Sequence, residues 1–85
     1  MFYVYIIYSL SFDKYYRGYS ENPLRRLEQH NRGESNYTKS FGPWSLVFVQ
    51  SFELKKDALK REKVLKKYSK SQIVRLMNTP LNELL

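Results

Sequence analysis

The sequence predicts an α/β (α+β) fold, in which helices pack on a small, mainly antiparallel three-stranded sheet in the order β-β-α-β-α-α. Three observations support this prediction. Short segments rich in aromatic and β-branched residues alternate with segments of helical period. The first two apolar segments are joined by a connection short enough for a hairpin. The chain has 85 residues, which is enough for one hydrophobic core. We therefore expect residues 1–85 to form a single domain with helices covering the sheet.

The first two strands are expected to form a hairpin. Phe2–Ser9 is apolar and shows little polar alternation, which is typical of a central strand covered on both faces. Residues 10–14 form the turn, and Tyr15–Ser20 forms the second strand. Gly18 lies within that second strand, where a glycine often marks the close approach of another group.

A helix and a loop follow the hairpin. Asn22 is a suitable N-cap, and Pro23 fits the first helical position. The helix is expected to run to about Asn31, because Gly33 follows as a stop signal. Residues 32–43 are polar and contain two glycines and a proline, so they are predicted to form a loop long enough to carry a function.

The third strand is predicted at Ser45–Phe52. Strict alternation would place Leu46 and Phe48 on one face and Val47 and Val49 on the other.

Two helices are predicted after this strand. Residues 53–67 have helical period, and Ser69 or Ser71 could cap a last helix that ends by Pro80. The residues that this last helix would turn inward are Ile73, Leu76 and Met77.

The charge of the chain favours a polyanionic partner. Fifteen Lys and Arg residues face eight Asp and Glu residues, and the net charge is +7. Eight of the fifteen basic residues lie between Lys55 and Lys70. Such a potential attracts nucleic acid most often, while ribosomal RNA and an anionic membrane surface are alternatives. A solvated helix whose lysines only confer solubility explains the basic run equally well.

Composition also bears on the compartment. The chain has no cysteine, which excludes disulfides and thiolate metal sites and fits a reducing compartment. The apolar start is short, with no basic segment before it and no small-residue cleavage site. No stretch approaches the ~20 apolar residues of a membrane span. We therefore expect a cytoplasmic domain with no membrane partner.

The helix after the hairpin carries the first candidate site residues. Arg26 and His30 are one turn apart on the same face, which borders an apolar stripe made by Leu24 and Leu27. From there both could reach toward the sheet, whereas Gln29 should point outward. The alternative is that the stem of Arg26 covers the core while His30 interacts with the end of the helix.

Glu62 is the second candidate. On a helical wheel it lies within the arc shared by Leu54, Ala58 and Leu65. A buried carboxylate needs a partner charge or a metal. Its oxygens suit a hard divalent cation such as Mg²⁺, and a structural salt bridge to an arginine of this helix or of the first helix is the alternative.

The third candidate is the pair formed by Tyr5 and Tyr16. They lie on neighbouring strands and can point to the same face. A phenol can hold or deprotonate a water beside a metal, or bond a phosphate oxygen. Ordinary sheet packing is the alternative for either tyrosine, since the chain has eight.

Together and in this order, these segments resemble the GIY-YIG nuclease superfamily, and in particular its small stand-alone bacterial members. Tyr3-Val4-Tyr5 corresponds to the first triplet, and Tyr16-Arg17-Gly18 to the second. Pro23–Asn31 is similar to the arginine-bearing helix of the family, and Ala58–Lys63 to its glutamate motif. Two positions depart from the pattern: Tyr3 replaces a glycine, and Arg17 replaces a small or β-branched residue.

The resemblance implies a role for each site residue. Tyr5 and Tyr16 would line the site, and one of them would activate or orient the attacking water. Arg26 would bind the scissile phosphate, and His30 would assist near the phosphate or the nucleophile. Glu62 would hold a single divalent metal, Mg²⁺ or Mn²⁺. A metal and Arg26 could lower the tyrosine pKa, or the tyrosine could relay a proton to His30, and the sequence leaves both routes open.

The implied function is a divalent-metal-dependent endonuclease that hydrolyses DNA phosphodiester bonds, selects DNA structure, and acts in repair or recombination with a protein partner that supplies specificity. A nucleic-acid-binding module that keeps the nuclease fold without cutting is an alternative, as is a basic RNA-associated protein. The residues expected to contact nucleic acid are Arg17, Lys39, Lys60 and Lys63. Arg17 points away from Tyr16 if neighbours alternate faces, so it could instead cover the opposite face of the sheet.

Overall fold

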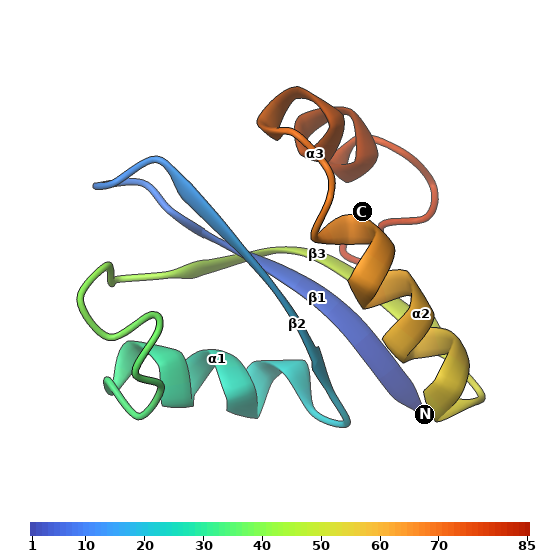
Figure 1. The fold of residues 1–85 in the computed structure, drawn as a ribbon, viewed down its shortest axis with the longest axis horizontal. Helices are drawn as coiled ribbons and strands as arrows, with labels where there is room; N and C mark the ends of the chain where they lie inside the picture. Colours follow the sequence, from blue (N-terminus) through green and yellow to red (C-terminus); the bar gives the residue numbers. More distant parts are fainter.

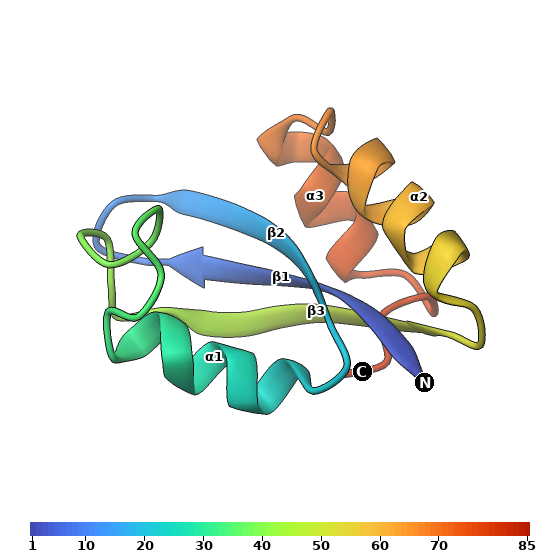
Figure 2. The same ribbon diagram turned by 60° about the horizontal axis from the view of Figure 1, so that its bottom comes forward.

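The computed structural model describes residues 1–85 and has the predicted order of elements. The elements are β1 (Phe2–Ser9), β2 (Lys14–Ser20), α1 (Pro23–Asn31), β3 (Ser45–Phe52), α2 (Lys55–Leu65) and α3 (Lys70–Met77). The three strands form one antiparallel sheet in the order β2-β1-β3, so β1 is central as predicted. Helix α1 covers one face of the sheet, and α2 and α3 cover the other (Figures 1 and 2). The predicted fold class is confirmed.

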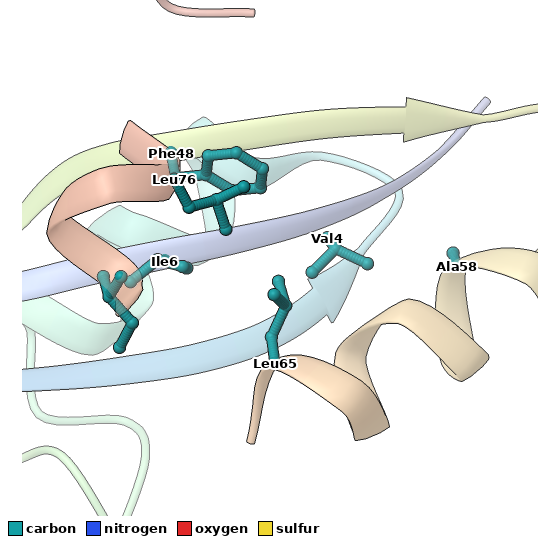
Figure 3. Packing of buried hydrophobic residues seen from close by; sticks show 7 residues of the cluster. Val4, Ile6, Phe48, Ala58, Leu65 and Leu76 are labelled. Carbon is teal, nitrogen blue, oxygen red and sulfur yellow. The ribbon is translucent and has the colours of Figure 1, made fainter. Parts of the chain in front are cut away.

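The central strand divides the core between the two faces. Val4 and Ile6 point toward α2 and α3, while Tyr5 and Ile7 point toward α1. Figure 3 shows the cluster under α2 and α3. Its buried members are Val4, Ile6, Phe48, Ala58, Leu65, Ile73 and Leu76. Burial of one such aliphatic side chain stabilises the fold by about 1.5–3 kcal/mol, so a strand buried on both faces is a rigid base for side chains that project from it.

Strand β3 departs from the alternation predicted for it. Two consecutive residues of β1 pair with Phe48 and Leu46, so Val47 is an extra residue that forms a β-bulge. Val47 therefore packs with Phe48 toward α2 and α3, and Leu46 packs with Val49 toward α1. The prediction that paired Leu46 with Phe48 and Val47 with Val49 was wrong, because it assumed uninterrupted alternation.

The predicted caps are confirmed at α1 and α3. The Asn22 side chain accepts a hydrogen bond from a backbone N–H of α1, and Gly33 follows the helix with a positive φ of 78°. Helix α3 begins with a capping box formed by Ser69 and Gln72. Helix α2 is shorter than the predicted 53–67, because the chain turns soon after Leu65.

The C-terminal residues protect the outer edge of β3. The buried side chain of Asn82 donates to the carbonyls of Val47 (2.9 Å) and Met77 (3.0 Å) and accepts from the N–H of Val49 (3.3 Å). The N–H of Glu83 donates to the Val49 carbonyl at 2.8 Å. These bonds satisfy groups that an edge strand would otherwise leave open to pairing with another chain. No helix of the chain is both long and apolar enough to cross a membrane.

Candidate active site

The candidate site is built around Tyr5 and the strand beside it. Tyr5 pairs with Gly18 across the β1–β2 ladder, and its ring lies over that glycine. A Cβ atom at position 18 would overlap with Cζ and the hydroxyl oxygen of Tyr5. The glycine is therefore required by close approach rather than by backbone conformation, and it lets the phenol cross the outer strand.

His30 holds the Tyr5 hydroxyl from the side of α1. Its Nε2 lies 2.8 Å from the Tyr5 oxygen, and its Nδ1 lies 2.6 Å from the Thr38 hydroxyl oxygen. His30 is only 1% exposed, and Tyr5 and Thr38 are equally buried. Both ring nitrogens are thus engaged inside the protein. His30 contacts the Tyr5 hydroxyl directly, and its ring is buried in the protein.

Burial keeps this pair neutral. Burial and, to a smaller extent, the nearby positive charge of Arg26 together lower the pKa of His30 to about 4. Burial also raises the pKa of Tyr5 above its ordinary value; Tyr16 and Glu62 raise it too, while Arg26 opposes the rise. At neutral pH the site therefore holds a phenol and an imidazole, both uncharged, between a cation and an anion.

Tyr16 and Arg26 complete the α1 side of the site. Tyr16 lies two residues from Gly18 on the same face of β2, and its ring stands edge-on to the His30 ring with centroids 5.0 Å apart. Arg26 is half-buried, and its Nη1 donates to Oε1 of Gln29 at 2.9 Å.

Two details of the predicted helix face need correction. Leu27 packs against the cluster that contains Tyr5, but Leu24 is exposed, so the apolar stripe is narrower than predicted. Gln29 was expected to point outward, yet it is partly buried and orients Arg26. The helix is short, and Arg26, Gln29 and His30 of its inward side serve the site rather than the core.

Glu62 approaches the site from the other face of the sheet. Its side chain is 18% exposed, and its carboxylate lies 3.5 Å from Nζ of Lys66 one turn later. The predicted inward arc holds for Ala58 and Leu65, which are buried, but not for Leu54, which precedes the helix and is half-exposed. Since β2 is the outer strand, α2 can present Glu62 beside its edge, where the negative charge acts on the Tyr5 phenol.

A family model that describes the GIY-YIG catalytic domain matches residues 1–78. The chain belongs to the GIY-YIG family. Members of this family are in general nucleases, and GIY-YIG nucleases generally depend on a divalent metal. The resemblance seen in the sequence is thereby confirmed.

The relatives that match this GIY-YIG chain are of similar length. UPF0213 proteins from Staphylococcus aureus strains Mu3 and Mu50 are each 40% identical over 76 residues, which is 88% of this chain and 92% of the relative. The solution NMR structure of a UPF0213 protein from Bacillus halodurans is 29% identical with a TM-score of 0.59. That comparison covers 99% of this chain and 90% of the other.

The Glu62 carboxylate is a chemically suitable ligand for a divalent cation at this GIY-YIG site. No group of three or more His, Cys, Asp or Glu side chains lies close enough together to hold a metal by itself. Glu62 could offer carboxylate oxygens, while water and phosphate oxygens of a substrate would fill the other positions. Mg²⁺ is commonly bound in this way, through one or two carboxylates and a phosphate.

Thr38 is a residue of the site that the sequence did not reveal. The indole Nε1 of Trp44 donates to the Thr38 carbonyl at 3.0 Å. The Asn31 side chain in turn accepts from the Trp44 N–H (2.6 Å) and donates to its carbonyl (3.1 Å). This network fixes the loop after α1 so that the Thr38 hydroxyl meets His30. A threonine in a polar loop carries no signal of such a contact in the sequence.

The residues predicted to contact nucleic acid fall into two groups. Lys39, Lys60 and Lys63 are exposed and make no ion pair in the protein. Arg17 differs, because its Nη2 donates to the Tyr68 carbonyl at 2.6 Å on the α2 and α3 side. Its Nε is buried without a partner, and burial lowers its pKa. The structure does not bring Arg17 to Tyr5; it ties the sheet to the connection between α2 and α3.

Gly18→Ala should damage the site and the fold together. The added methyl group must displace the Tyr5 ring, and overpacking of this kind typically costs about 1–3 kcal/mol. Urea denaturation would measure the loss. Gly42→Ala is the matched control, since its Cβ would meet Trp44 at 3.7 Å and Asn31 at 3.9 Å, which are ordinary contacts. Equal stability of the two variants would contradict the close packing of Tyr5 on Gly18.

His30 should titrate far below an ordinary histidine. It is the only histidine of the chain, so its imidazole signals in an NMR titration are unambiguous, and they should report a pKa of about 4. Because the unfolded chain binds the proton first, near 6.5, the stabilising contribution of neutral His30 is complete above pH 6.5 and is lost as pH falls toward 4. His30→Gln should lose this part of the pH dependence. A measured pKa near 6.5 would show that the ring is not buried as described.

Proposed function

We propose that the chain is a divalent-metal-dependent endonuclease that hydrolyses DNA phosphodiester bonds within the single domain 1–85. The observation that carries the proposal is the buried, neutral Tyr5–His30 pair with Arg26 on one side and Glu62 on the other. Membership of a family that consists in general of nucleases supports it.

Arg26 and Glu62 would have separate electrostatic roles in the reaction. Phosphodiester hydrolysis builds up negative charge on the phosphoryl oxygens, and an arginine can meet two of them with a fixed fork of N–H donors. Gln29 orients this fork through its bond to Nη1. Glu62 would hold the cation, which when bound supplies Lewis-acid stabilisation of a phosphate oxygen. Tyr16, whose ring contacts His30, would line the substrate side of the site.

Tyr5 would act as the base through His30. A phenol whose pKa is raised by burial cannot ionise by itself at neutral pH. It can accept the proton of the attacking water while its own proton passes to Nε2 of His30, 2.8 Å away. This requires His30 to carry its resting proton on Nδ1 and to donate it to the Thr38 hydroxyl. A bound phosphate anion would favour the imidazolium that forms.

The position of His30 supports a more specific role than the sequence predicted. The sequence placed it near the phosphate or the nucleophile, whereas its burial and its two hydrogen bonds favour action through Tyr5. The raised pKa of Tyr5 also favours the proton relay over direct ionisation of the tyrosine.

Phosphate contacts would hold the DNA without reading its sequence. The net charge of +7 and the exposed Lys39, Lys60 and Lys63 suit this role. Selectivity would then come from DNA structure or from a protein partner, as in repair or recombination. The lack of cysteine fits action in the cytoplasm.

One observation favours a second candidate, a nucleic-acid-binding module that does not cut. Nζ of Lys66 lies 3.5 Å from the Glu62 carboxylate, so this acid already has a cationic partner within the protein. If this pair persists on DNA, binding should weaken steeply with salt and Arg26→Ala should affect it only modestly. Cleavage of many substrate molecules by each protein molecule would exclude this candidate.

Glu62→Gln should abolish cleavage while the fold remains intact. The amide keeps the shape of the side chain but loses the charge that would hold the cation, so a loss of at least about a hundredfold is expected. Nicking of supercoiled plasmid and of branched DNA with Mg²⁺ or Mn²⁺ measures it. Glu28→Gln is the matched control, since Glu28 is an exposed residue of α1 that pairs only with Arg32. If native protein and Glu62→Gln show the same residual cleavage, the activity is a contaminant and the proposal fails.

A further inference from the structure

A hollow opens beside the site, between the tip of the β1–β2 hairpin and the loop after α1. Its walls are mainly aromatic. The aromatic residues that line it are Phe12, Tyr15, Tyr16, Tyr37, Phe41 and Trp44. Tyr16 belongs to the hollow and to the candidate site alike, because its ring also contacts His30. Whatever occupies the hollow therefore lies next to the reacting group.

The aromatic side chains at its mouth face solvent. Tyr37 is 76% exposed, and its ring leans on Tyr16 with centroids 5.6 Å apart. Phe12 is half-exposed and meets Phe41 edge-on at 5.3 Å. Single exposed apolar residues need no explanation, but two exposed aromatic side chains beside partly buried ones around one hollow indicate a binding surface.

Ammonium groups accompany these rings. Lys14 lies over the Phe41 ring at 4.3 Å, and Lys70 lines the same hollow, where Asp13 offsets part of its charge at 2.9 Å. A second hollow shares Tyr16 and Tyr37 with the first and is also lined by Lys66, whose Nζ lies 3.5 Å from the Glu62 carboxylate. Cations and aromatic side chains thus line both hollows, and a cation of the second hollow contacts the carboxylate of the candidate site.

Lysines beside exposed aromatic rings favour one chemical class of ligand. Lysines alone would suit any polyanion, but stacking faces between lysines suit nucleobases joined by phosphates. A base within a continuous duplex has both faces covered by its neighbours and cannot reach into a hollow. An unpaired base can, because one of its faces is free to lie on an aromatic side chain.

We propose that this hollow holds an unpaired nucleobase of the strand whose phosphodiester lies at Tyr5, with the Tyr37 ring stacked on that base; the inference rests on the proposed nuclease function and specifies its substrate. The preferred substrate then has a single-stranded nucleotide at the cleaved bond, as in a gap, a flap or a loop. A continuous duplex is bound only through its phosphates.

Binding without cleavage tests the inference separately from the chemistry. Glu62→Gln protein in EDTA is titrated with a short single-stranded oligothymidine that carries one 2-aminopurine, whose fluorescence reports stacking. The inference predicts a fluorescence change that a blunt duplex of the same sequence does not give. Tyr37→Ala, added to Glu62→Gln, should weaken single-strand binding by about tenfold, the typical effect of one lost stacking partner. Tyr37→Phe should retain binding.

Leu10→Ala is the matched control, since Leu10 is 81% exposed in the same hairpin turn and does not line the hollow. Equal binding of single strand and duplex, or loss of binding that is the same for Tyr37→Ala and Leu10→Ala, would overturn the inference. Cleavage by the native chain that is insensitive to Tyr37→Ala would count against the inference alone. Stacking by the variant without any cleavage by the native chain would count against the nuclease proposal alone.

Discussion

Tyr5 lies in the most deeply buried strand, and its ring crosses the outer strand at Gly18, where no side chain fills the space. This single packing arrangement joins the two faces of the sheet. It brings a hydroxyl from the α1 face to the edge of β2, beside which α2 presents Glu62. Without the gap at Gly18, the phenol could not occupy this position, and Arg26 and Glu62 would have no common group between them.

The rest of the α1 side is organised to hold that hydroxyl. His30 bonds to it, Thr38 bonds to His30, and Trp44 and Asn31 fix the loop that carries Thr38. His30, Thr38 and Trp44 are buried, so the bonds among them and to Tyr5 are formed away from competing water, and each orients the next. Such preorganisation is what a site needs if its charges are to stabilise a transition state without rearranging. The burial that orders this network also keeps the imidazole neutral.

Local rules predicted the elements of the fold, while the arrangements that depend on contacts between distant segments were not predictable in this way. Caps, turns and apolar runs located every strand and helix, because these signals act within a few residues. The bulge at Val47 and the bonds of Asn82 to β3 depend on which strand or tail lies alongside, so alternation and composition did not reveal them. At the site, helical spacing brought Arg26 and His30 to one face, but Thr38 and the Lys66 partner of Glu62 emerge only when the chain is folded.

The central claim is that Tyr5 and His30 act as one unit, and a double-mutant cycle on the single-turnover rate of cleavage tests it most directly. Tyr5→Phe removes the hydroxyl, and His30→Gln removes the basic ring nitrogen that would take its proton. If the proton passes from Tyr5 to His30, the double variant should be no slower than the slower single variant, because either change already breaks the relay. If the two losses multiply, the residues act independently, and the account of a coupled pair is wrong.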